Sequence, residues 1–163
     1  MKVIYLVSLL ILLISESTRA QDISNYAIGV RFGDNDGFGA EVSYQHKLDY
    51  HERLEVDFGY RDYRNFDAFK LTGIYQWDWN IVGGFNWYFG IGAGLGSWSY
   101  HNGQVGDEKD GLFTNAVGNL GIEYNFYNAP ILVSLDFRPE YSVTGNYGED
   151  SHLDLAVSFR YQF

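Results

Sequence analysis

Hydrophobic and polar residues alternate along most of the chain, most regularly in its last twelve residues, 152–163. Leu153, Leu155 and Val157 begin one apolar face there, while Asp154 and Ser158 lie on the opposite, polar face. A period of two predicts a β-strand with one apolar and one polar side. Seven other segments alternate in the same way and are separated by turn sequences. The eight predicted strands cover residues 25–32, 38–48, 54–61, 69–79, 85–99, 113–126, 131–142 and 152–163.

A few positions depart from this simple pattern. The alternation places Phe38 on the apolar face, whereas Ile74 falls on the polar face of its strand. Pro139 lacks a backbone N–H, so we expect a bulge or a local gap in strand pairing there. The polar face of strand 85–99 is rich in glycine, which predicts room for bulky neighbours such as Tyr88 and Trp98. The glycine-rich and acidic segment 101–111 is predicted to be a loop.

Eight consecutive strands without an intervening helical segment predict an all-β, antiparallel, up-and-down barrel that closes on itself. Two architectures share this pattern, a soluble ligand-binding barrel and a transmembrane β-barrel. The interior of an eight-stranded barrel is only just wide enough to be filled by side chains, and the many aromatic residues of the apolar face do not fit inside it. The apolar face is therefore predicted to face lipid, with aromatic girdles at both ends of the strands.

The polar face carries charges of both signs. If these charges are buried in a barrel lumen, they can pair with one another. The predicted lumen charge network consists of Arg31, Glu41, Lys47, Glu55, Asp57, Arg61, Lys70, Asp78, Glu123, Asp136, Arg138, Glu140, Asp154 and Arg160. Oppositely charged side chains that reach across a narrow barrel occlude it, so we expect no open pore.

The N-terminal segment has the pattern of an export signal. Lys2 precedes an apolar stretch that ends near Ile14, and a small-residue site follows at Ala20. This predicts a cleaved signal peptide over residues 1–20 and a barrel domain over 21–163, with an uncleaved signal anchor as the alternative. The apolar stretch is shorter than the roughly 20 residues of a spanning helix.

Composition excludes several classes of function. The 163 residues include no cysteine, so the chain has neither disulfides nor thiolate metal sites. A formal net charge of −10 argues against a nucleic-acid partner. The acidic turns at 34–37 and 107–110 lack the spacing of a calcium loop and are interpreted as solvated, so neither a metal site nor a cofactor is expected.

In these features the chain from residue 21 to 163 resembles the small eight-stranded outer-membrane barrels of the OmpA/OmpX type, in particular their barrel-only members. The alternating aromatic ending, with Phe159, Tyr161 and Phe163, is similar to the signal by which the outer-membrane assembly machinery recognises its clients. The resemblance implies a monomer in the cell outer membrane, in contact with lipid and lipopolysaccharide. Its implied role is structural or in surface interaction through the outer loops.

Some barrels of this kind are lipid A-modifying acyl hydrolases or acyltransferases that use a serine, a histidine and an acid. Ser142, His152 and Asp154 all fall on the polar face near one rim, and hairpin pairing is predicted to bring Ser142 close to His152. Such a set suffices for a base-activated hydroxyl, but no recognised signature surrounds the serine and nothing marks an oxyanion site. Ordinary hydrogen bonding in the lumen is the favoured interpretation and no enzymatic activity is expected. The enzyme and a soluble lipocalin-like binder are the alternatives.

Overall fold

The computed structural model describes residues 24–33, 38–63, 66–101, 108–145 and 151–163. The predicted signal peptide and the turn at 34–37 lie outside these residues. The strands are β1 (Tyr26–Phe32), β2 (Ala40–Asp49), β3 (Glu52–Tyr63), β4 (Phe66–Val82), β5 (Phe85–His101), β6 (Glu108–Asn125), β7 (Ile131–Thr144) and β8 (Ser151–Gln162). Within this part of the chain, no helix is long and apolar enough to cross a membrane.

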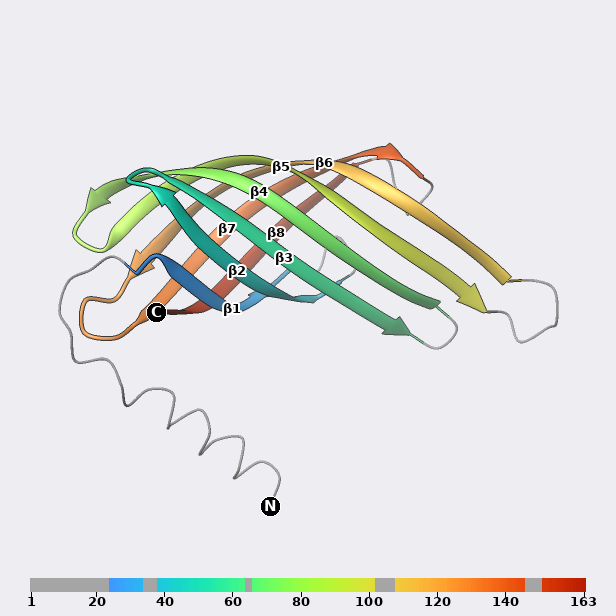
Figure 1. The fold of residues 1–163 in the computed structure, drawn as a ribbon, viewed down its shortest axis with the longest axis horizontal. Helices are drawn as coiled ribbons and strands as arrows, with labels where there is room; N and C mark the ends of the chain where they lie inside the picture. Colours follow the sequence, from blue (N-terminus) through green and yellow to red (C-terminus); the bar gives the residue numbers. More distant parts are fainter. Residues whose placement is uncertain (1–23, 34–37, 64–65, 102–107, 146–150) are drawn as a thin grey trace, which may run out of the picture.

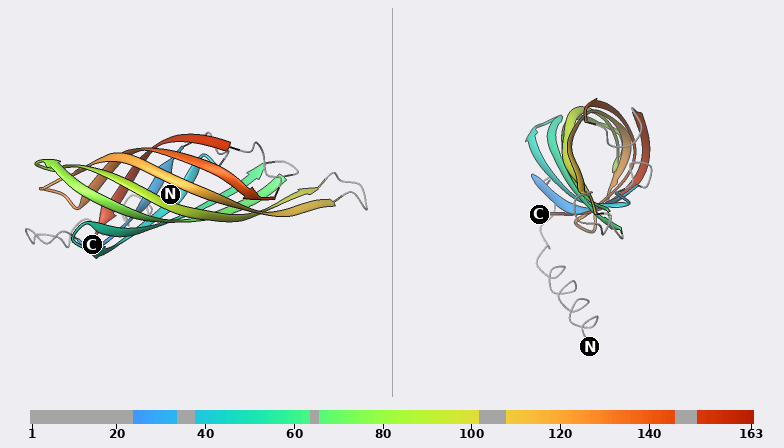
Figure 2. Two further views of the ribbon diagram at one scale, coloured as in Figure 1. Left: turned by 90° about the horizontal axis from the view of Figure 1, so that it is seen from above. Right: turned by 90° about the vertical axis from the view of Figure 1, so that its right-hand side faces the viewer.

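The eight strands form one closed antiparallel barrel in sequence order (Figure 1). Each strand pairs with the next along the chain, and β8 pairs with β1 to complete the ring, with Phe159 opposite Val30. The end-on view in Figure 2 shows the strands surrounding a central lumen. The predicted fold, an all-β up-and-down barrel of eight strands, is confirmed, and closure leaves no free sheet edges over its paired length.

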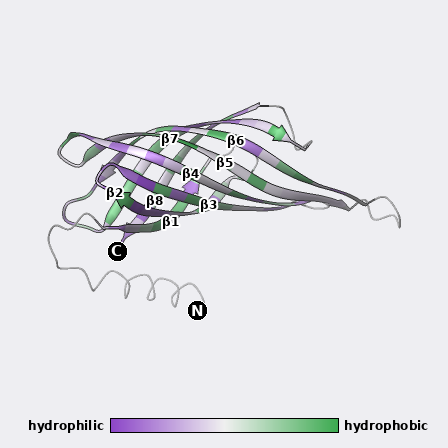
Figure 3. Ribbon diagram, turned by 45° about the horizontal axis from the view of Figure 1, so that its top comes forward, coloured by the Kyte–Doolittle hydropathy of each residue, from purple (hydrophilic) through white to green (hydrophobic). Residues whose placement is uncertain are grey.

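Alternation along each strand separates an outward apolar face from an inward polar face. Along β8, for example, Leu155 and Phe159 are exposed whereas Asp154 and Arg160 are buried. Figure 3 shows the resulting hydropathy bands along the strands. One end of the barrel, here called the turn end, carries the short turns at residues 50–51, 83–84 and 126–130. The outward face includes several aromatic contacts near this end, among them Trp79 stacked on Trp87 with ring centroids 4.6 Å apart. This arrangement is the reverse of a water-soluble protein, which buries its apolar side chains.

Phe38 is a correction to the sequence prediction, because its side chain is buried inside the barrel instead of facing outward. It precedes β2, and the next residue, Gly39, has a positive φ of 71°. The amide of Ala40 donates a hydrogen bond to the carbonyl of Phe38 at this turn. The chain therefore reverses its side-chain direction at Gly39, and the alternation of β2 does not extend back to Phe38.

Several strands extend beyond their predicted ranges, and the extension of β5 and β6 corrects a predicted loop. The segment 101–111 was expected to be a loop, but His101 belongs to β5 and residues 108–111 belong to β6, where Ser99 pairs with Asp110. These residues are polar, and strand pairing with β5 overrides their weak strand propensity. At Pro139 the pairing between β6 and β7 is interrupted between Val117↔Glu140 and Leu120↔Phe137, while the register is unchanged. The predicted local gap is thus present.

Candidate functional site: the charged lumen

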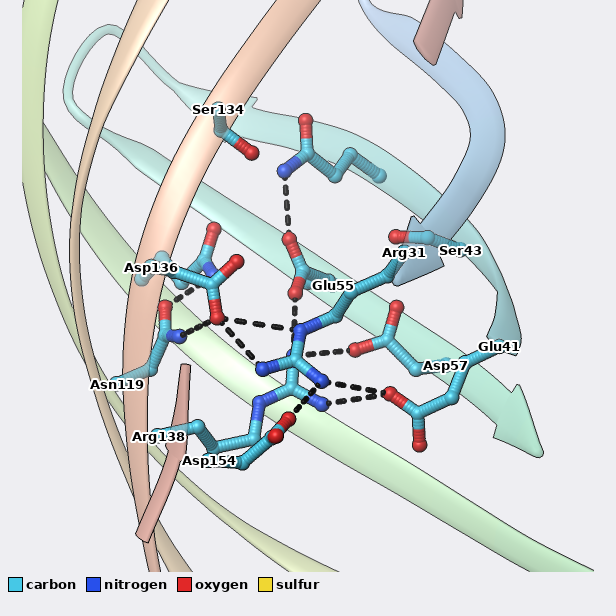
Figure 4. Close-up of polar contacts among 12 residues, drawn as sticks. Arg31, Glu41, Ser43, Glu55, Asp57, Asn119, Ser134, Asp136, Arg138 and Asp154 are labelled. Atoms are coloured by element: carbon cyan, nitrogen blue, oxygen red, sulfur yellow. Dashed lines mark hydrogen bonds and ion pairs between the residues drawn. The ribbon is translucent and has the colours of Figure 1, made fainter. Parts of the chain in front are cut away.

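Two arginines occupy the centre of the lumen. Arg31 of β1 forms ion pairs with Asp136 at 2.8 Å and with Asp154 at 2.6 Å. Arg138 of β7 pairs with Asp57 at 2.6 Å. Both guanidinium groups also contact the same oxygen, Oε2 of Glu41, at 3.1 and 3.2 Å (Figure 4). Each cation is therefore surrounded by carboxylates from different strands.

The ion pairs continue from this centre toward both ends of the barrel. Arg138 reaches Glu55 at 2.9 Å, and Arg160 contacts the other oxygen of Glu55 at 3.0 Å. On the other side, Lys70 pairs with Glu140 at 3.0 Å. These contacts join strands β3, β4, β7 and β8 across the lumen, because residues far apart in sequence face one another once the barrel has closed.

Arg53 extends the network to the turn end of the lumen, and the sequence prediction did not include it. Its guanidinium pairs with Glu123 at 2.8 Å and donates a hydrogen bond of 2.6 Å to Gln76. Gln76 in turn donates to Asn119, which lies 3.4 Å from Asp136. Strand three was predicted to begin at residue 54, so Arg53 was placed on neither face of a strand. If the alternation of this strand is extended by one inward position toward the N-terminus, it includes Arg53.

Three predicted members lie outside these connected ion pairs. Lys47 and Asp78 are partly exposed at the turn end, where the Lys47 ammonium lies 5.4 Å from the centre of the Tyr50 ring. Arg61 is partly exposed near the opposite end, above the Phe66 ring at 5.6 Å. The other eleven predicted residues are buried and charged, and they face the lumen.

Burial makes these contacts necessary. Taking a charge out of water costs several kcal/mol unless it is paired and hydrogen-bonded. Arg31, Arg138, Asp57 and Asp154 are all 0% exposed. Hydroxyl and amide groups complete the arrangement, as where Arg160 donates to Ser43 and Ser134. The lumen is therefore filled by polar side chains that hold one another.

An apolar cluster lies beside the charges. The buried side chains of Phe38, Ala68 and Phe113 pack together, with Phe66 and Trp98 against them. The Lys70 ammonium lies 5.1 Å from the centre of the Phe38 ring, so this cluster adjoins the ion pairs directly. The sequence prediction placed Phe38 on the outside and therefore did not identify this cluster.

The candidate catalytic residues do not share a single set of contacts. Asp154 is fully buried and bound by Arg31. His152 lies opposite Glu140 in the β7–β8 register, and Ser142 lies opposite Asn115 on β6. On β7, Glu140 is the partner of His152, and Ser142 is the next residue along the strand that faces inward. The described contacts of Asp154 are those of a lumen anion that balances an arginine.

Comparison with known proteins identifies related structures only at the level of the fold. No protein-family model and no curated protein matches the sequence. The N-terminal β-barrel domain of Pseudomonas aeruginosa OprF superposes with a TM-score of 0.64 at 15% identity, covering 86% of this chain and 98% of that domain. Neisserial surface protein A superposes with a TM-score of 0.61 at 14% identity, covering 85% of this chain and 94% of the Neisserial chain. Ail, the attachment invasion locus protein of Yersinia pestis, superposes with a TM-score of 0.57 at 15% identity, covering 86% of this chain and 97% of Ail.

The chain is thus a small eight-stranded β-barrel with the fold of outer-membrane proteins. Its similarity to the OprF domain, the Neisserial protein and Ail extends over nearly the whole of each of those chains. At this level of identity the likeness establishes the architecture, and function has to be argued from the residues of this chain.

Proposed function

We propose that this protein is exported and spans the outer membrane as a monomeric closed barrel without an open pore. Its role is structural or in surface interaction at the cell envelope. The observation that carries the proposal is the inverted distribution of side chains: paired charges fill the interior while large apolar residues cover the outside. A bilayer is the solvent that suits such a surface, since in water an apolar patch of this extent leads to aggregation.

The interior argues against the alternative of a soluble ligand-binding barrel. A lipocalin-like binder encloses its ligand among inward-facing apolar side chains. In the described part of this barrel, charged residues occupy the central inward positions: Arg31 and Arg138 both pair with Glu41, and Arg138 also pairs with Glu55. Such an interior leaves the apolar outer face as the surface that requires a partner, and membrane lipid, including lipopolysaccharide in the outer leaflet, is that partner.

Tryptophan quenching by brominated lipids tests the membrane orientation. Two variants each keep one tryptophan and carry phenylalanine at the other three: one keeps Trp87, which is 40% exposed on the outer face, and one keeps Trp98, which packs against the lumen cluster. We expect strong quenching of Trp87 and little quenching of Trp98 in brominated bilayers. Equal quenching of both, or recovery of the protein in the soluble fraction of cells, would contradict the proposal.

The C-terminal residue provides a test of assembly. Phe163 donates its backbone N–H to Tyr26, and its ring stacks on that of Tyr26 at 5.8 Å, where β8 meets β1. If this aromatic ending is recognised by the assembly machinery, Phe163→Ala will lower the amount of folded protein in the outer membrane several-fold. Refolding of the purified variant into detergent will be affected much less, as measured by heat-modifiable gel mobility. Equal loss in both assays would indicate a purely structural role.

A further inference from the structure

The described part of the barrel contains a cavity of about 360 Å³ at the turn end of the lumen, lined by charged, polar and apolar side chains. Its walls come from all eight strands, from the short turns and from the segment that precedes β1. This volume lies within the usual range of small-molecule sites. We call this cavity the vestibule.

The vestibule is closed on its inner side. Arg53 reaches across the lumen to Glu123, and the same guanidinium lies 4.6 Å from the centre of the Tyr88 ring. Gln76 accepts a further hydrogen bond from Arg53 and is fully buried. A small polar molecule can therefore enter from the turn end but cannot continue through the barrel.

Three charged side chains at the vestibule, those of Arg53, Asp78 and Lys47, can each accommodate a further partner. Nη2 of Arg53 is buried and has no hydrogen-bond acceptor among the described residues. In the same part of the structure, the Asp78 carboxylate and the Lys47 ammonium form no ion pair within 4.0 Å. Donors for an anion and an acceptor for a cation thus line one cavity.

The rest of the lining suits a peptide. Asn125 and Gln162 present amide groups that can donate to and accept from a peptide backbone. Tyr50, Tyr127 and Leu132 provide apolar surface for small side chains. A site lined by both charges, by amides and by a few apolar groups differs from a simple anion site.

We propose that the vestibule binds a short zwitterionic peptide. Its carboxylate accepts hydrogen bonds from Arg53 and Lys47, and its ammonium group pairs with Asp78. Both contacts are charge-assisted, and Arg53 is already held in position by Glu123 and Gln76. This inference does not depend on the membrane role, because binding and membrane insertion are measured separately.

Calorimetric titration with trialanine tests the proposal, using the purified full-length protein in lipid nanodiscs. We expect saturable binding of trialanine with one site per barrel. N-acetyl-trialanine lacks the ammonium group and trialanine amide lacks the carboxylate, so each is expected to bind at least tenfold more weakly. Absence of binding by correctly folded protein, or equal affinity for all three peptides, would overturn the proposal.

Matched variants identify the residue that reads each end of the peptide. Asp78→Asn is expected to abolish the preference for trialanine over its N-acetyl form, and Lys47→Gln is expected to reduce the preference over the amide. Asp62→Asn, an exposed carboxylate of β3 near the opposite end, serves as the control and should change neither. Heat-modifiable gel mobility verifies folding of each variant. A preference that persists in Asp78→Asn contradicts the assigned orientation, whereas failed membrane insertion would contradict the proposed function instead.

Discussion

At the scale of single residues, the arginines of the lumen are held by contacts that no local sequence motif specifies. Arg138 is fully buried and contacts three carboxylates, those of Glu41, Glu55 and Asp57. These acids come from the neighbouring strands β2 and β3, whereas Arg138 comes from β7. The guanidinium group suits this position because its planar set of five donors can bind several oxygens at once.

Loss of this cation should be costly. In Arg138→Gln three carboxylates lose their shared partner in a buried site, and breaking such a site costs about 3–5 kcal/mol. We expect a decrease of that size in the free energy of unfolding, measured by urea titration in lipid vesicles with tryptophan fluorescence. Arg61→Gln is the control: this side chain is partly exposed, so about 0.5 kcal/mol or less is expected. Similar losses in both variants would show that the ion pairs around Arg138 are not essential.

Ser142 provides a residue-scale test of the enzyme alternative. Asp154 is bound to Arg31, and the register aligns His152 with Glu140 and not with Ser142. We expect mass spectra of lipid A to be the same in cells that express the protein and in cells that express Ser142→Ala. A change in acylation that depends on Ser142 would reinstate the acyl hydrolase or acyltransferase.

At the scale of elements, glycines of β6 make room for large side chains of β5. Tyr88 is completely buried and lies opposite Gly121 in the register. A Cβ atom on Gly121 would overlap the ring and hydroxyl of Tyr88, and one on Gly111 would overlap the indole of Trp98. The sequence prediction assigned this space to the glycines of β5 itself. The space for Tyr88 and Trp98 is provided instead by glycines of the neighbouring strand β6. Two residues that face each other across a strand pair are closer together than two alternate residues along one strand.

This packing predicts that two glycine substitutions will differ in their effect on the free energy of unfolding. Gly121→Ala should reduce the free energy of unfolding by about 1–3 kcal/mol, because Tyr88 must move within a filled lumen. Gly73→Ala should be nearly neutral, since an added Cβ there meets nothing within 4 Å.

The same urea titrations measure both substitutions. Tyr88→Leu combined with Gly121→Ala should cost less than the sum of the two single changes. Strict additivity would show that Tyr88 and Gly121 are not in contact.

At the scale of the whole molecule, closure turns eight half-polar strands into a cylinder whose central part is filled by paired side chains. The ion pairs run from Arg53 and Glu123 at the turn end to Lys70 and Glu140, where the apolar cluster around Phe38 and Phe113 adjoins them. Ion passage would require several of these contacts to separate at the same time. We therefore expect the barrel to be occluded.

Planar bilayer recordings test this occlusion. We expect no persistent conductance from the inserted protein at neutral pH and moderate voltage, because the side chains across the lumen are bound to one another. Insertion is verified in parallel by heat-modifiable mobility of the protein recovered from the bilayer lipids. A steady single-channel current with the native sequence would contradict the occluded lumen.

The sequence by itself determined the strands and the two faces of each one, because side-chain direction in a strand alternates with a period of two. That pattern located eight strands, placed Ile74 inward and predicted the interrupted pairing near Pro139. Only the tertiary structure decided which charges meet, as Arg53 meets Glu123, and that Phe38 turns inward at Gly39. These features depend on register, on closure between β8 and β1 and on one positive φ, and such long-range geometry leaves no mark in local alternation.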